Sequence, residues 1–239
     1  MVWLRRRTGV LVMLANRLIG LARGSGGNDP YWDNVVSLLH FDGTDGSTLF
    51  TDEKELTWTA TGTAALSTTE KKFGTASLRA GTGNAVNTSG NSGFNFYGTE
   101  STLELFLKLD SASSTGNLIS EWNSNLRFNF AISASNTARF MFYEVPTALR
   151  QFTFPISYTG AFVHLALCRT SAGLFRAFVD GAEATVSAPG PYSGGVFAPT
   201  TEGVRIGSAA CYVDELRITK GVARYTADFT PPSAPFQND

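Results

Sequence analysis

From residue 31 onward the sequence consists of short runs in which apolar and polar residues alternate. The clearest run lies between residues 103 and 109, where Leu103, Leu105, Leu107 and Leu109 alternate with Glu104, Phe106 and Lys108. A period of two places alternate residues on opposite faces of a β-strand. Turn dipeptides such as Asp42-Gly43 and Asp180-Gly181 separate the runs, and no helical period intervenes. This pattern predicts an all-β sandwich or barrel.

Further short runs give the expected strands. They cover residues 35–41, 57–65, 77–79, 85–87, 118–122, 126–132, 139–144, 162–169, 174–179 and 184–187. The chain has 239 residues, 43% of them hydrophobic and 12% aromatic, which is enough for one core. Neither an internal repeat nor a second domain is evident, so the sequence predicts one β-domain over 31–239 and a separate arm over 1–30.

The arm carries a leucine stripe and most of the local positive charge. Residues 9–23 are expected to form a helix with Leu11, Leu14, Leu18 and Leu21 on one side, after Arg5, Arg6 and Arg7. A glycine-rich linker over 24–30 separates this helix from the β-domain. Because a short helix needs a partner for its apolar face, we expect an assembly anchor that contacts copies of itself or a neighbouring protein. The alternative is a helix that packs on its own domain.

Charge is unevenly divided between the arm and the β-domain. Five arginines against Asp29 give residues 1–30 a charge of +4, so the remainder carries −5 of the total of −1. A basic arm can dock on an acidic surface, but the whole chain offers no electrostatic case for specific nucleic-acid binding. The apolar run is too short for a membrane span and lacks an A-x-A cleavage site, so neither a span nor a signal peptide is expected.

Two cysteines, Cys168 and Cys211, lie in expected strands. They form no C-x-x-C motif and no Cys/His metal-binding spacing. Two buried free thiols are the main interpretation, since a buried cysteine usually behaves as a small apolar residue. A disulfide between them is the alternative.

Five segments occur in an order that is typical of one family. They are VVSLLHFDGTDGS at 35–47, KKFGTASLRAGTGNAV at 71–86, STLELFLKLD at 101–110, FVHLALCRTSAGLFRAFVDGA at 162–182 and VRIGSAACYVDELRITKGVARYTADFTPP at 204–232. Together they resemble the LamG-like, concanavalin A-like jelly-roll domains of tailed-phage virion proteins. Phe106 and Phe162 stand where that pattern usually has tryptophan.

The resemblance implies a fold and a class of function. The fold would be a two-sheet antiparallel jelly-roll sandwich, here preceded by the short N-terminal helix. The protein would be a non-enzymatic virion component, either a capsid decoration or a part of the tail, fibre or baseplate. Its partners would be other virion proteins, bound through the arm, and copies of itself, and its sandwich would aid attachment to host-surface glycans. A dedicated carbohydrate-binding adhesin is the alternative, and a glycoside hydrolase a weaker one.

Catalysis has little support in the residues. The glucanases of the family that this sequence resembles carry the motif E-x-D-x-x-E on one strand. No such set of three carboxylates occurs in this sequence. Strand alternation predicts that Asp214 shares a face with Leu216 and Ile218, and that Glu215 lies on the other. His164 has no accompanying nucleophile and is expected to be a hydrogen-bonded core residue.

The acidic pair Asp214-Glu215 has two other interpretations. It can form a cross-strand salt bridge or accept hydrogen bonds from loop amides. It can also contribute to a calcium site, for which Asp42, Asp45 and Asp214 are the candidate ligands. No other cofactor is expected.

Glycan or partner contacts are expected from aromatic side chains on loops and strand ends. The candidates are Trp122, Tyr143, Tyr192 and Phe197. Sugar sites on sandwiches combine such rings with asparagine and aspartate side chains and backbone amides. The Pro/Gly-rich stretch 187–200, which contains Tyr192 and Phe197, is a loop of the kind that carries contacts.

Overall fold

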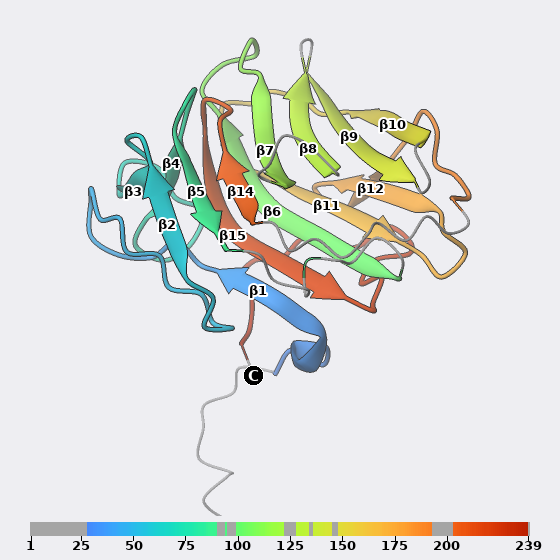
Figure 1. Ribbon diagram of the computed structural model, residues 1–239, viewed down its shortest axis with the longest axis horizontal. Helices are drawn as coiled ribbons and strands as arrows, with labels where there is room; N and C mark the ends of the chain where they lie inside the picture. Colours follow the sequence, from blue (N-terminus) through green and yellow to red (C-terminus); the bar gives the residue numbers. More distant parts are fainter. Residues whose placement is uncertain are drawn as a thin grey trace, which may run out of the picture.

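Two antiparallel β-sheets stack face to face in the computed structural model of this protein (Figure 1). The structure describes residues 28–89, 94, 99–121, 128–133, 136–144, 148–192 and 203–238, with the backbone alone at 143, 144 and 148. Sheet A has the strand order β13-β12-β11-β6-β15-β4-β3, and β1 also pairs with β15. Sheet B has the order β10-β9-β8-β7-β14-β5-β2. In Figure 1 sheet B runs as a curved row from β2 at the left to β10 at the right.

The strand bounds are as follows. In sheet A they are β1 Val35–Leu39, β3 Ala65–Ser67, β4 Ser77–Ala80, β6 Ser101–Leu109, β11 Val163–Arg169, β12 Phe175–Val179, β13 Ala182–Ala184 and β15 Cys211–Lys220. In sheet B they are β2 Trp58–Thr61, β5 Ala85–Thr88, β7 Gly116–Glu121, β8 Phe128–Ser133, β9 Thr137–Glu144, β10 Ala148–Pro155 and β14 Val204–Gly207.

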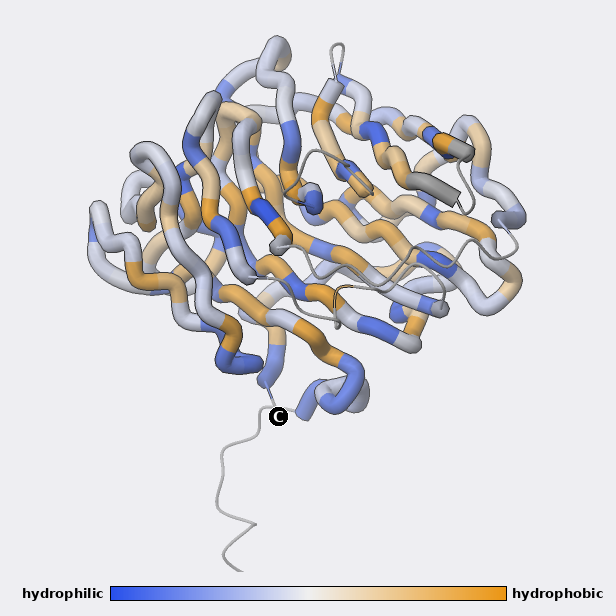
Figure 2. The backbone as a smooth tube through the Cα atoms, viewed as in Figure 1, coloured by the Kyte–Doolittle hydropathy of each residue, from blue (hydrophilic) through white to orange (hydrophobic). Residues whose placement is uncertain are grey.

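The core lies between the two sheets and is rich in phenylalanine. At the β8–β10 end the rings of Phe128, Phe130, Phe140, Phe142, Phe152, Phe154 and Phe175 form one cluster. Figure 2 shows hydrophobic and hydrophilic residues alternating along many of the strands, as the period of two requires. The all-β sandwich predicted from the sequence is therefore confirmed.

A C-terminal strap, residues 221–238, follows β15 and covers part of the outer face of sheet A. The rings of Tyr225 and Phe229 stack with centroids 3.6 Å apart and pack on Phe178. The amide of Phe229 donates to the carbonyl of Gly181, in the turn between β12 and β13. Further along, Phe236 packs on Phe106. The strap thus buries apolar surface that sheet A would otherwise expose.

Two strand predictions need correction. The expected strand over 57–65 is two strands, because Gly62, with φ +64°, turns the chain from β2 in sheet B to β3 in sheet A. The run that forms β10 was missed, although its alternating Phe152 and Phe154 are buried. β10 pairs with β9 along its whole length.

The prediction that Asp214 shares a strand face with Leu216 and Ile218 was also wrong. Between Asp214 and Arg217 the pairing of β15 with β6 slips by one residue, and Glu215 adopts φ +52°. This β-bulge resets the alternation. Leu216 and Ile218 lie in the core, whereas Asp214 pairs with Phe106 in the outer cluster. The two residues therefore point to different sides of sheet A.

The expected N-terminal helix over 9–23, with its leucine stripe and Arg5, Arg6 and Arg7, lies outside the described residues. Ahead of β1 the described chain forms a 3-10 turn, η1, Trp32–Asn34. That part of the chain includes no helix with the length and hydropathy needed to cross a bilayer. Both cysteines are buried and free, which confirms the main interpretation.

Candidate functional site on the outer face of sheet B

The carboxylates and imidazoles singled out in the sequence are held in structural contacts on sheet A. His164 is fully buried, and its Nε2 lies 3.2 Å from Oε2 of Glu104. Glu104 also accepts hydrogen bonds from the Nε of Arg217 at 2.9 Å and the hydroxyl of Tyr225 at 2.9 Å. The expectation that His164 is a packed core histidine is confirmed.

This network is completed by Asp29, at the start of the described chain. Its carboxylate accepts hydrogen bonds from Arg217 at 3.0 Å and from Arg224 at 2.9 and 2.7 Å. Although burial acts to raise it, the charge of Arg217 and the contact with His164 lower the pKa of Glu104 to about 2. The network joins β6, β11 and β15 to the strap.

The acidic pair at the bulge contacts other parts of the chain. Asp214 accepts hydrogen bonds from the amides of Lys72 at 2.7 Å and Phe73 at 3.2 Å, as expected for a carboxylate that caps loop amides. Glu215 lies 2.9 Å from Nδ1 of His40 and accepts a hydrogen bond from the amide of Phe236 at 2.9 Å. Glu215 therefore links His40, the residue that follows β1, to the end of the strap.

Burial raises the pKa of Asp214 to about 7, and the charges of Glu215 and Asp42 act in the same direction. The Oδ1 atom of Asp214 is buried and has no hydrogen-bond partner. For His40 burial acts to lower the pKa, but the hydrogen bond and the charge of Glu215 outweigh it and raise the pKa.

The three candidate calcium ligands have partners in neighbouring loops. Asp42 accepts a hydrogen bond from the amide of Thr75, and Asp45 accepts one from the amide of Thr68 at 2.9 Å. Within the described ranges, no three His, Cys, Asp or Glu side chains are arranged to hold a metal ion. A calcium site at Asp42, Asp45 and Asp214 stays a prediction, and the buried, unpartnered Oδ1 of Asp214 is the atom that favours it.

Of the aromatic candidates, Tyr192 is the one whose side chain the structure describes. Its ring is half-buried and meets Phe142 edge to face, with centroids 5.1 Å apart. Its hydroxyl donates to the carbonyl of Ala188 at 2.8 Å. These contacts tie the ring to the core. Trp122 and Phe197 lie outside the described residues, as does the side chain of Tyr143 in β9.

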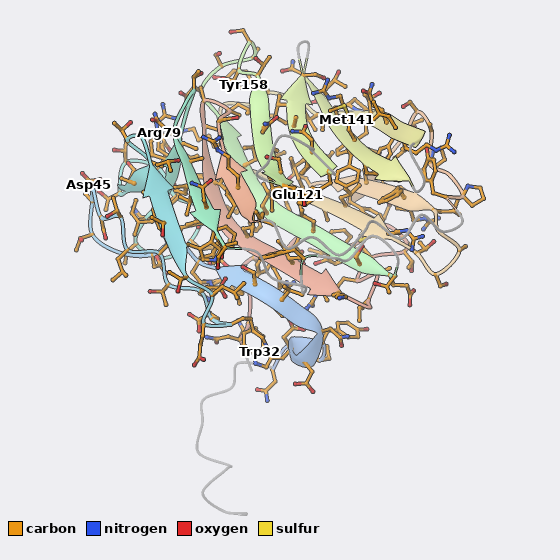
Figure 3. All side chains as sticks on the ribbon, in the orientation of Figure 1. Trp32, Asp45, Arg79, Glu121, Met141 and Tyr158 are labelled. Carbon is orange, nitrogen blue, oxygen red and sulfur yellow. The ribbon has the colours of Figure 1, made fainter. Side chains whose placement is uncertain are left out.

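The sequence did not single out the outer face of sheet B, where polar residues line up across the strands. Core residues on each strand fix which positions point outward: Phe140 and Phe142 on β9 place Arg139 and Met141 on the outer face. The register then aligns one row, which runs Gln151, Met141, Asn129, Ser120, Arg205, Asn87 and Thr59. Figure 3 shows Met141 on β9 of this sheet.

The inner members of this row are buried although they point away from the core. Asn129 and Ser120 are each 2% exposed and Asn87 is 7% exposed. Arg205 and Met141 are partly exposed, and Gln151 and Thr59 are exposed. The row is thus polar, mostly buried at its centre and exposed at its two ends.

Comparison with known proteins identifies the fold. The family model of the concanavalin A-like lectin/glucanases superfamily matches residues 80–222. No match was found among curated proteins.

Solved structures with a similar fold include binding and receptor-binding domains. The binding domain of Paraclostridial mosquitocidal protein 1 superposes with a TM-score of 0.61 at 10% identity, covering 80% of this chain and 49% of that one. The receptor-binding domain of botulinum neurotoxin C/D mosaic serotype gives 0.61 at 10% identity, covering 78% and 48%. The binding domain of botulinum neurotoxin DC, in complex with rat synaptotagmin II, gives 0.61 at 10% identity, covering 79% and 48%.

This chain spans about half the length of these structures. At such identities the likeness concerns the fold. The family match covers more than half of the chain and agrees with the two-sheet sandwich described above. The chain therefore belongs to the concanavalin A-like lectin/glucanase superfamily.

Proposed function

We propose that this protein is a non-enzymatic accessory component of a tailed-phage particle whose sandwich binds the host surface. The N-terminal arm, with Leu11, Leu14, Leu18 and Leu21, attaches the protein to the particle and to copies of itself. The sandwich is the displayed part. The role in a phage particle is supported by the resemblance of the five sequence segments. The binding role is supported by the fold.

One observation carries the non-enzymatic part of the proposal. The buried carboxylate and imidazole of Glu104 and His164 face each other and are 0% exposed. A general acid or base has to reach the proton that it transfers, and these groups cannot reach a substrate without disrupting the core. Glu215 is likewise committed to His40 and the strap.

The binding part is supported by the fold and by the outer face of sheet B. The binding domain of Paraclostridial mosquitocidal protein 1 and the receptor-binding domain of botulinum neurotoxin C/D mosaic serotype share the sandwich. The exposed ends of the polar row, Gln151 on β10 and Thr59 on β2, are the parts of this face open to a partner. Fold likeness alone does not transfer a ligand, so the test must measure binding by this chain.

The arm is tested by a deletion that leaves the sandwich intact. Residues 1–27 are removed, and Asp29 is kept because it belongs to the buried network with Arg217 and Arg224. We expect a folded protein, with an unchanged melting temperature, that no longer joins the particle. A variant with Leu14→Glu and Leu18→Glu in the full chain should behave in the same way. Incorporation of either variant at the normal level would overturn the anchor.

Surface binding is tested with purified full-length protein on host cells and on a glycan array. Saturable binding supports the attachment role. The carbohydrate-binding adhesin is the second candidate, favoured by the lectin family to which the chain belongs. It predicts the same binding but no dependence of function on particle incorporation. Absence of binding to cells and glycans would leave a purely structural particle component.

A further inference from the structure

Strand β10 lies at one end of sheet B and, among the described strands, pairs only with β9 (Figure 1). It spans eight residues, Ala148–Pro155, which is longer than an average strand. The outer edge of a sheet presents backbone N–H and C=O groups that can pair with another chain, and proteins usually shorten or cover such edges. The edge of β10 therefore deserves comparison with the other edges of the sandwich.

Three other edge strands are covered by their own chain. The amide of Leu66 in β3 donates to the carbonyl of Ser47 at 2.8 Å, and the amide of Glu53 donates to the carbonyl of Leu38 in β1 at 2.9 Å. The backbone of the three-residue β13 donates to a carboxylate of the strap at 2.8 Å. The fold thus closes these edges of sheet A with loops and with the strap.

The backbone groups of Leu149 and Gln151 face the outer edge of β10. Thr153 shows the direction, because its amide donates to Oγ of Ser187 at 2.9 Å and its carbonyl accepts from the amide of Ser187 at 3.0 Å, away from β9. Alternate residues of a strand direct their backbone groups to the same edge, so Leu149 and Gln151 point the same way as Thr153. Within the described chain, neither has a hydrogen-bond partner at that edge.

Both residues are accessible to a partner. Gln151 is exposed, and Leu149 is 52% exposed, although it is a large apolar residue. An antiparallel strand can exchange a pair of hydrogen bonds with each of them. Ser187 already occupies Thr153, and Pro155 has no amide hydrogen, so pairing beyond residue 151 is blocked. The open edge therefore fits a short extended segment.

Arg150 lies between the two open residues and determines which kind of strand fits. Its side chain is exposed, with the guanidinium 5.7 Å from the centre of the Tyr192 ring. If two copies of this chain paired with Leu149 of each opposite Gln151 of the other, the two Arg150 side chains would lie directly opposite each other. Like charges in this position are destabilising, whereas opposite charges are stabilising. A strand with an acidic residue here therefore fits better than a second copy.

The side chain of Leu149 adds a further preference. Phe152 and Phe154 lie in the core, so alternation places Leu149 and Gln151 on the outer face of the sheet. An apolar residue opposite Leu149 would cover its exposed side chain, and such cross-strand pairs stabilise a sheet. The edge thus selects by an apolar contact on one face and by charge on the other.

We propose that the open edge of β10 binds an extended segment of a partner protein, which adds an antiparallel strand to sheet B. The segment carries an acidic residue opposite Arg150 and an apolar residue opposite Leu149. Backbone hydrogen bonds at Leu149 and Gln151 provide affinity, and the two side-chain contacts provide selection. This interface goes beyond the attachment function and does not depend on it.

The test uses full-length protein and two short capped peptides. The peptides are identical, with valine and threonine around a central residue that is glutamate in one and lysine in the other. Binding is followed through the amide resonances of Leu149 and Gln151 up to millimolar peptide. The glutamate peptide should bind about fivefold more tightly than the lysine peptide. Methylation of its alternate backbone nitrogens, which prevents strand pairing, should abolish binding.

Three variants separate the backbone contribution from the charge. Gln151→Pro removes an amide hydrogen at the open edge, where proline is tolerated, so it should melt like wild type and bind the glutamate peptide about tenfold more weakly. Gln151→Thr keeps the amide and is the matched control, which should bind normally. Arg150→Glu should reverse the preference, so that the lysine peptide binds more tightly.

Several outcomes would overturn the inference. They are equal binding of the two peptides, binding of neither, or normal binding by Gln151→Pro. If Gln151→Pro melts at a lower temperature, the reversal in Arg150→Glu decides. A dimer in sedimentation that Gln151→Pro abolishes would mean that a second copy occupies the edge, against the acidic partner. These results leave binding to host cells, and with it the attachment function, to be judged separately.

Discussion

Glu104 and Arg217 are joined across β6 and β15 by a buried ion pair, in which Oε1 of Glu104 lies 2.9 Å from Nε and 2.8 Å from Nη2 of the guanidinium. The Glu104 side chain is 0% exposed and that of Arg217 is 7% exposed. A charge pair at this depth cannot be broken on one side without leaving the other charge uncompensated. It holds the strap and the bulged strand in one arrangement.

Substitution of Glu104 by glutamine should destabilise the protein strongly. Removing one partner of a buried ion pair costs about 3 kcal/mol. Urea unfolding at pH 7 would measure this loss. Asp110→Asn is the control, because its pair with Arg79 is partly exposed and should cost under ~1 kcal/mol. An equal effect of the two substitutions would contradict the structural role of the network.

Acid unfolding should depend on the same carboxylate. The pKa of Glu104 falls from 4.5 to about 2 in the folded protein, so its stabilising contribution is complete above pH 4.5 and is lost as the pH falls to 2. Wild-type stability should decrease over this interval more steeply than that of Glu104→Gln. Parallel profiles of the two proteins would show that Glu104 does not govern the acid transition.

The contact between His40 and Glu215 should stabilise the strap below neutral pH. The pKa of His40 is raised in the folded protein, so its contribution is complete below the ordinary value of 6.5 and is lost as the pH rises through the folded-state pKa. His40→Gln should cost about 1–2 kcal/mol at pH 6 and little at pH 9. Hydrogen exchange of the Phe236 amide, which donates to Glu215, reports the strap directly. A cost that does not change with pH would exclude a charged His40.

Asp214 should make the protein less stable as the pH rises. Its pKa increases from 3.8 to about 7 on folding, so the folded state holds a proton that the unfolded state has lost, and stability declines between these values. Asp214→Asn should be close to wild type at pH 3, where the carboxyl is protonated in both states, and should exceed it by about 4 kcal/mol at pH 8.5. Thermal unfolding at the two pH values measures the difference, and a constant difference would refute the raised pKa.

The calcium hypothesis for Asp42, Asp45 and Asp214 is tested in the same experiment. An ion that binds only the folded state raises the melting temperature, and a chelator reverses the rise. Wild type at pH 8.5 should respond to millimolar calcium, and Asp214→Asn should not. If calcium leaves the wild-type melting temperature unchanged, the three aspartates act through their loop hydrogen bonds alone.

Gly181 should be essential for docking of the strap. It has φ +80°, and a Cβ there would lie 2.0 Å from the backbone oxygen of Phe229. Gly181→Ala should cost about 2–4 kcal/mol in urea unfolding, since both backbone strain and a backbone clash oppose it. Gly46→Ala is the matched control, because Gly46 has φ +74° with no atom within 4 Å and should cost only about 1 kcal/mol. Similar losses in both variants would mean that the strap shifts freely.

The alternation of apolar and polar residues was enough to predict the all-β sandwich. Leu103 to Leu109 became β6, and Asp180-Gly181 became the turn between β12 and β13. The buried state of His164 and the free thiols of Cys168 and Cys211 also followed from local pattern. These features depend on the period of two and on apolar burial, both of which are encoded within a few residues.

The tertiary structure decided what local pattern cannot contain. The bulge at Glu215 adds one residue to β15 between Asp214 and Leu216. The two side chains therefore lie on opposite faces of sheet A, where simple alternation would place them on the same face. The alignment of Asn87, Arg205 and Asn129 required the register of strands that are far apart in the sequence. Strand pairing over such separations depends on the whole packed core, so the sequence alone determined the class of fold, and only the folded chain placed the polar row on sheet B.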